Sequence, residues 1–206
     1  MTDFYWHGLM MALAWLVLIP TGTVIARFYK VRPRQDFPGH ADDRFWWNSH
    51  RILQSVGAGL TVLAAWWAYK ARGGEMDWLV LHAQLGLAVI GLCALQIAAP
   101  MFRGTKGGPT DTYADPKDPG TWGGDHYDMT LRRRIFEAWH KNLGYVVMAA
   151  GAVAIWTGIE TAGLPDEWKW AFVVAALVFT AAFVRLTRLG RRIDTWIAIW
   201  GPDGGY

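Results

Sequence analysis

Polar and charged residues in this chain are gathered into clusters, and long apolar runs separate the clusters. A helix of about 20 apolar residues can cross a hydrocarbon core of roughly 30 Å. Five runs come near that length: Leu9–Phe28, Ile52–Tyr69, Trp78–Met101, Ala138–Ile159 and Trp168–Val184. The pattern therefore predicts five membrane spans within a single domain that covers residues 1–206.

The runs are typical of helices rather than of barrel strands. They are rich in Leu, Ala and Gly, and they lack the apolar and polar alternation of a membrane strand. The first run is predicted to be a retained helix and not a cleaved leader, because the Lys and Arg cluster follows it instead of preceding it. The expected fold is an all-α integral membrane bundle.

A sixth, shorter helix is expected at the carboxyl end. Ile193, Trp196, Ile197 and Trp200 recur at the spacing of one helical face, with Arg191, Arg192 and Asp194 off that face. This pattern favours a short helix lying in the membrane interface. A frayed tail is the alternative.

Basic residues are distributed unevenly between the two ends of the predicted spans. All Lys and Arg residues except Lys70, Arg72 and Lys169 fall on the side that carries the carboxyl terminus. Basic loops are retained in the cytoplasm, so we expect the amino terminus outside and the carboxyl terminus inside, in a bacterial inner (cell) membrane. The net charge of +3 then reflects topology and lipid contact, and no nucleic-acid partner is expected.

Four histidines fall at the beginning of the first four spans, one at each: His7, His50, His82 and His140. An ionisable residue within a span is costly and usually marks a function. Because successive spans alternate in direction, His7 can meet His82 at the outer side and His50 can meet His140 at the inner side.

Two converging imidazoles at each end suit a particular kind of metal site. Zinc and copper sites in proteins take three or four ligands, whereas a six-coordinate haem takes two axial histidines. Gly86 and Gly144 lie four residues after His82 and His140 and would leave room for a flat group. Arg51 is a candidate partner for a propionate, although the positive-inside pattern accounts for it equally well. Cys93 is the only cysteine, so no disulfide framework or cysteine metal site is expected.

Further residues around these histidines form a recognisable set of motifs. They are His7-Gly8, Met11, Ala14, Trp15, Pro20, Gly22 and Ala26-Arg27; Trp46, His50-Arg51 and Gln54; His82, Leu85-Gly86 and Gln96; and His140 with Leu143-Gly144-Tyr145. With them the chain resembles the transmembrane domain of the eukaryotic-type cytochrome b561 family, in the form that follows a DOMON domain, here expected without that domain. The resemblance implies two b haems, held by the first with the third and the second with the fourth histidine, and electron transfer from a reductant such as ascorbate to ferric iron or monodehydroascorbate.

The expected function is transmembrane electron transfer through two haem b groups, since axial ligation by two histidines leaves no open iron position for oxygen chemistry. One hypothesis is an oxidoreductase of the ferric or quinone reductase type that uses a small-molecule reductant. The alternative is a cytochrome b subunit that anchors a dehydrogenase or larger redox complex and links this partner protein to the quinone pool. A haem-free anchor or transporter is the third. The loop 103–134 would dock a partner or cover the inner haem, or else is a disordered insertion.

Overall fold

The computed structural model describes residues 2–103 and 131–202. Within these ranges every regular element is a helix. In chain order they are α1 (Thr2–Ala12), the π-helix η1 (Leu13–Leu18), α2 (Ile19–Phe28), α3 (Phe45–Ala71), α4 (Leu81–Ala98), the short 3₁₀-helix η2 (Ala99–Phe102), α5 (Leu131–Thr161), α6 (Asp166–Arg188) and α7 (Thr195–Trp200). Most of the predicted loop, with His126, lies outside the described residues.

Five helical segments are long and apolar enough to cross a membrane, as predicted: Phe4–Phe28, Phe45–Ala71, Leu81–Phe102, Ile135–Thr161 and Asp166–Arg188. The all-α class of a multi-pass membrane protein is therefore confirmed. The second span begins at Phe45, seven residues before the predicted start at Ile52. Trp46, Trp47 and Arg51 lower the mean hydropathy of residues 45–51, so this stretch was not included in the predicted span. Such residues are nevertheless common where a membrane helix passes through the interface.

The first span is one continuous helix with a π-helical turn in its middle, which the hydrophobic pattern did not predict. Pro20 follows this turn at the start of α2. Proline has no N–H for the carbonyl four residues earlier, here that of Leu16, and its ring would clash with that carbonyl in a regular helix. A wider turn before Pro20 relieves the clash.

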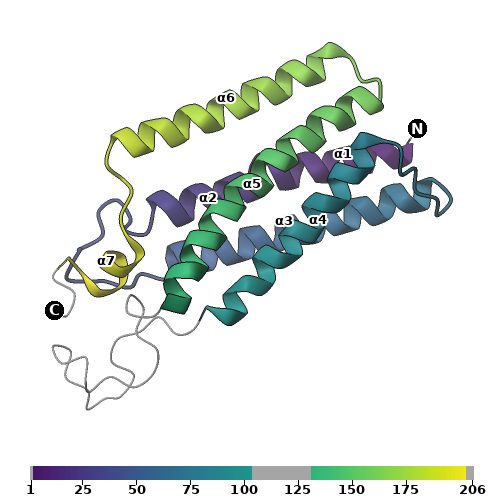
Figure 1. The fold of residues 1–206 in the computed structure, drawn as a ribbon. Helices are drawn as coiled ribbons and strands as arrows, with labels where there is room; N and C mark the ends of the chain where they lie inside the picture. Colours follow the sequence, from purple (N-terminus) through teal and green to yellow (C-terminus); the bar gives the residue numbers. More distant parts are fainter. Residues whose placement is uncertain (1, 104–130, 203–206) are drawn as a thin grey trace.

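The first four spans form two helix pairs. The first span packs mainly along α3, and α4 packs mainly along α5 (Figure 1). A buried cluster of Ala14, Trp15, Ile19, Val89 and Val147 joins the two pairs in the middle of the bundle. We call the first span with α3 the first hairpin, and α4 with α5 the second hairpin.

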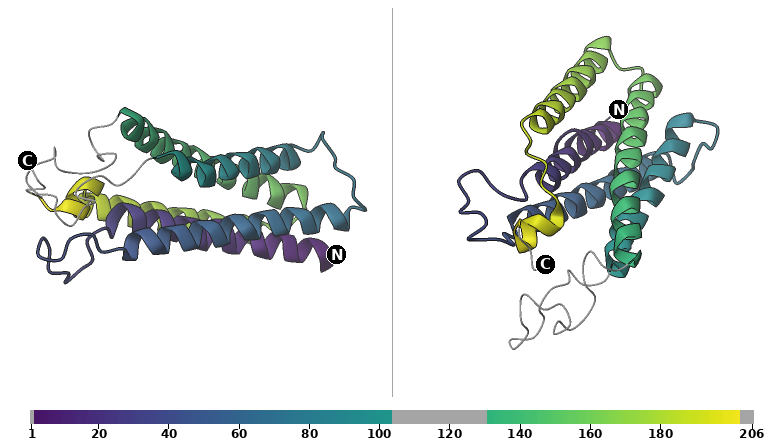
Figure 2. Two further views of the ribbon diagram at one scale, coloured as in Figure 1. Left: turned by 90° about the horizontal axis from the view of Figure 1, so that it is seen from below. Right: turned by 60° about the vertical axis from the view of Figure 1, so that its left-hand side comes forward.

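Helix α6 lies at the edge of this four-helix core and contributes no buried residue to it. Figure 2 shows it running beside α5 and the first span, with the amino terminus at the opposite end of the bundle from α7. The odd-numbered spans therefore begin at the end that carries the amino terminus, as alternation requires.

The short carboxyl-terminal helix is present, and it packs against the segment that joins the first two spans. The backbone N–H of Asp42 donates to the carbonyl of Ala198 at 3.0 Å, and Lys30 Nζ donates to the carbonyl of Ile193 at 2.9 Å. Ala198 and Ile199 are buried, whereas Ile197 of the predicted stripe is half-buried. The side chains of Trp196 and Trp200 lie outside the described set, so the predicted interfacial face stays a prediction.

Candidate functional site

At the end of the bundle that carries the amino terminus, His7 of α1 faces His82 of α4. Their ring centres are 5.9 Å apart and their planes are inclined by 85°. His82 lies in the first turn of α4, and His7 lies just inside the first span. The two rings come from different hairpins, so this pair bridges the two halves of the core.

At the other end, His50 of α3 faces His140 of α5. Their ring centres are 6.3 Å apart and their planes are inclined by 82°. This pair also takes one ring from each hairpin. The structure thus brings the four histidines together in the two combinations that alternating spans allow. The buried cluster that contains Trp15 lies between the two histidine pairs, which we call the two histidine levels.

Three of the four rings are held in place by a main-chain carbonyl of the neighbouring helix in the same hairpin. The Nδ1 of His7 bonds to Ala64 O at 2.9 Å, that of His50 to Gly22 O at 3.1 Å, and that of His82 to Ala154 O at 2.9 Å. A carbonyl only accepts, so each Nδ1 carries the proton. The Nε2 lone pair of each ring is then left available as a metal ligand.

The spacing of the two rings within each pair fits ligation of one metal ion from opposite sides. An imidazole nitrogen binds a transition metal at about 2.0–2.1 Å and lies roughly 1 Å from the ring centre, so two such rings have centres about 6 Å apart. The observed separations are 5.9 and 6.3 Å. Among the described residues, no three His, Cys, Asp or Glu side chains gather as a metal site with more ligands.

The predicted glycines lie beside the pairs with space around them. No heavy atom comes within 4 Å of a Cβ placed on Gly86, apart from its own helix, and the one close to Gly144 is Gln96 Nε2 at 3.4 Å. A third glycine beside a histidine pair, Gly158, was not predicted from the sequence. A Cβ on Gly158 would meet His82 Cε1 at 2.9 Å, so any larger residue here would displace the His82 ring from its present position. The Ala154–Gly158 spacing, small residues four apart on a membrane helix, was the available signal.

Basic residues surround the His50/His140 pair. The guanidinium groups of Arg51 and Arg103 both lie over the ring of Trp47, at 5.7 and 4.1 Å from its centre. Burial lowers the pKa of Arg103, and the neighbouring charges of Arg133 and Arg51 lower it further. Arg51 was predicted from the sequence, but Arg103 was not; the fold brings Arg103 to this group from the end of the third span.

Gln96 connects α4 to the backbone at His140. Its Nε2 donates to the carbonyl of His140 at 3.0 Å, while its buried Oε1 has no hydrogen-bond partner among the described residues. Cys93 packs against the central cluster.

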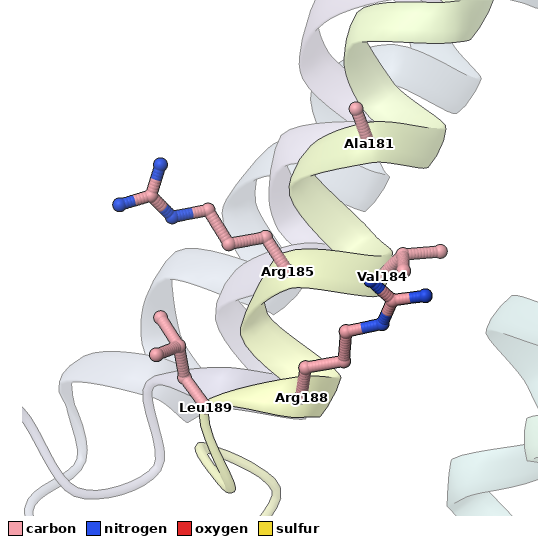
Figure 3. Close-up of a pocket in the computed structure, with 5 residues that line it drawn as sticks. All are labelled: Ala181, Val184, Arg185, Arg188 and Leu189. Carbon is pink, nitrogen blue, oxygen red and sulfur yellow. The ribbon is translucent and has the colours of Figure 1, made fainter.

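The hollow drawn in Figure 3 is a different feature. Ala181, Val184, Arg185 and Arg188 from the end of α6 line it, together with Leu189 directly after the helix. No histidine contributes to it, so it is not part of the candidate site.

Comparison with known proteins gives a family match over part of the chain. Residues 6–104 match the family described as eukaryotic cytochrome b561, which confirms the resemblance predicted from the sequence. Ferric-chelate reductase 1 of Homo sapiens is 28% identical over 79% of this chain and 24% of its own length. The putative ferric-chelate reductase 1 of Xenopus laevis is 28% identical over 87% of this chain and 27% of its own length.

A plant relative is similar to the same extent. A cytochrome b561 and DOMON domain-containing protein of Arabidopsis thaliana is 26% identical over 86% of this chain and 36% of its own length. The chain therefore spans about a quarter to a third of the length of these relatives. No solved structure gives a significant match.

Proposed function

Because residues 6–104 match the cytochrome b561 family, we propose that this chain carries electrons across a membrane through two b haems. His7 and His82 would hold one, and His50 and His140 the other. The observation that carries the proposal is the pair of facing imidazole rings at each end of the bundle, at 5.9 and 6.3 Å. When bound, haem with two histidine ligands supplies one-electron chemistry without an open iron position.

The chain's own residues prepare each site. The carbonyl groups of Ala64, Gly22 and Ala154 fix the rings of His7, His50 and His82, so little reorganisation is needed on binding. Gly86 and Gly144 leave space beside the ligands, and the buried cluster around Trp15 keeps water from the region between the two levels. Arg51 and Arg103 are placed to pair with propionates at the second site.

We infer ferric chelates as the acceptor, because the human and frog relatives carry the name of ferric-chelate reductase. Each transfer would add one electron to ferric iron and leave ferrous iron. The described basic residues gather at the end of the bundle with His50 and His140, which supports a cytoplasmic location for that end. The bacterial inner membrane stays a prediction, since the relatives named above come from animals and a plant.

Haem content tests the first part of the proposal. Purified protein should contain two haem b per chain with low-spin spectra, measured as the pyridine haemochrome. His50→Ala and His140→Ala should each remove the same half of the reduced absorption band, and His7→Ala and His82→Ala the other half. His40→Ala, a change at an exposed histidine outside both pairs, should keep both. One haem per chain, or a shared loss in His7→Ala and His50→Ala, would refute the assignment.

Transfer across the membrane tests the second part. In vesicles containing the protein and a trapped ferric chelate, an impermeant reductant outside should produce ferrous iron inside. The His40→Ala protein should match the unchanged chain. Variants of either histidine pair should fall to the rate of protein-free vesicles, and an undiminished rate in those variants would contradict the proposed path.

A further inference from the structure

The four histidines are not held alike. His7, His50 and His82 each donate from Nδ1 to a carbonyl, but the buried Nδ1 of His140 has no hydrogen-bond partner among the described residues. The His140 ring instead stacks on Phe136 of its own helix, with ring centres 5.2 Å apart and planes inclined by 22°. The pair at the amino-terminal end thus has two carbonyl acceptors, and the other pair has one.

The charge around the two pairs differs as well. Arg103 and Lys141 lie within electrostatic range of the His140 ring, and Arg51 and Arg133 lie near Arg103. Glu137 is the acidic partner of Arg133 and Lys141 in this group. At the opposite end Lys169 contacts both Glu160 and Asp166 at 3.0 Å, and Arg72 lies 3.7 Å from Asp77.

Both differences act on a bound haem in the same direction. A hydrogen bond from Nδ1–H to a carbonyl makes the imidazole a stronger electron donor, which favours ferric iron and lowers the reduction potential. Positive charge nearby favours the ferrous state, which has one positive charge less. The pair with one acceptor and more cations should therefore have the higher potential.

We propose that His50 and His140, with Arg103 and Lys141, set a higher reduction potential than His7 and His82 set at the other end. The proposal rests on the proposed function, because it requires a haem at each pair. The difference in reduction potential gives the transfer a direction. An electron that enters at the amino-terminal end would move to the haem site at the end with the basic cluster and would be found there for most of the time. We expect at least a tenfold preference for that end, which is about 59 mV for a one-electron couple.

A spectroelectrochemical titration of the purified holoprotein provides the test. Two one-electron waves are expected, and His140→Ala should remove the one at higher potential. Removal of the wave at lower potential, or waves that coincide, would overturn the proposal. Fewer than two haems in the unchanged protein would instead refute the proposed function, so the two failures are distinguishable.

A second variant covers the case in which His140→Ala loses both haems or does not fold. The double variant Arg103→Gln, Lys141→Gln keeps all four ligands and removes two positive charges near His140. The higher wave should move down and the lower wave should stay. Lys169→Gln is the matched control, because it removes a cation at the other end, and it should leave the higher wave in place. A shift of the lower wave in the double variant, or of neither wave, would overturn the proposal.

Discussion

The indole nitrogen of Trp15 donates a hydrogen bond to the hydroxyl of Thr61, 3.0 Å away, in the buried middle of the bundle. Thr61 in turn donates to the carbonyl of Gly57 at 2.8 Å. A Cβ on Gly151 would lie 2.3 Å from the Trp15 ring, so α5 also fits closely around this side chain. One tryptophan in the π-helical turn therefore connects three helices between the two histidine levels.

Thr61→Val should destabilise the protein through this contact. The substitution keeps the shape but leaves the buried indole N–H without an acceptor, which costs about 1–3 kcal/mol. The free energy of unfolding in detergent measures the loss, and Thr61→Ser, which keeps the hydroxyl, should lose less. Equal stability of Thr61→Val and the unchanged chain would mean that the hydrogen bond contributes little.

Gly158→Ala should disturb the His7/His82 pair alone. The added methyl group would lie 2.9 Å from His82 Cε1, so the ring must turn away from its carbonyl partner Ala154. We expect loss of up to half of the reduced haem band, from the component that His82→Ala removes. Gly59→Ala is the matched control, because a Cβ there meets no heavy atom within 4 Å outside its own helix. An intact band in Gly158→Ala would show that the ring has room to move.

The docking of the carboxyl-terminal segment should depend on pH through Lys30. Burial, with the nearby charge of Lys141, lowers the pKa of Lys30 from 10.5 to about 8, while Asp194 and Glu137 oppose the shift and Arg192 adds to it. The docked lysine loses its proton first, so docking is weakest below about pH 8 and strengthens as pH rises towards 10.5. The hydrogen bond to Ile193 needs only an N–H and persists in the neutral amine.

The mobility of a spin label at Ile197→Cys in a Cys93→Ala background measures this docking. The mobile fraction should fall between pH 7.5 and pH 10, a range that we choose to bracket the shifted pKa. Lys30→Met should remove the dependence, whereas Lys70→Met, at an exposed position, should preserve it. The same pH response in Lys30→Met would assign the effect to another group.

Orientation can be checked with two single cysteines in the Cys93→Ala background. Glu75→Cys lies at the end of the bundle with the amino terminus, and His40→Cys lies at the end with α7; both positions are exposed. In intact cells an impermeant thiol reagent should label Glu75→Cys and spare His40→Cys. The reverse pattern would place the basic end outside and invert the proposed direction of electron transfer.

The sequence was sufficient to predict the features that depend only on the length of the apolar runs and on the alternating direction of the spans. Apolar run length predicted the five spans, and alternation of the spans predicted which histidines could meet. Both arguments need only the length of a helix and its direction. The start of α3 was misjudged because the tryptophans and Arg51 of its first turns look polar on average.

Other features depend on the rotation of each helix about its own axis, which the pattern does not determine. Whether the Nδ1 of His140 meets a carbonyl or the ring stacks on Phe136 is decided by a fraction of a turn of α5. The closeness of Gly158 to His82 has the same origin. The π-helical turn before Pro20 is a local response to a missing N–H, and no periodicity argument anticipates it.

The division of the core into two hairpins has a consequence for biogenesis. Each hairpin is closed internally by histidine-to-carbonyl hydrogen bonds, whereas each histidine pair takes one ring from either hairpin. The hairpins can therefore enter the bilayer one after the other as the chain is made. A cofactor that binds both members of a pair would then fasten them together at each membrane surface, so maturation of the protein would depend on the supply of haem as well as on insertion.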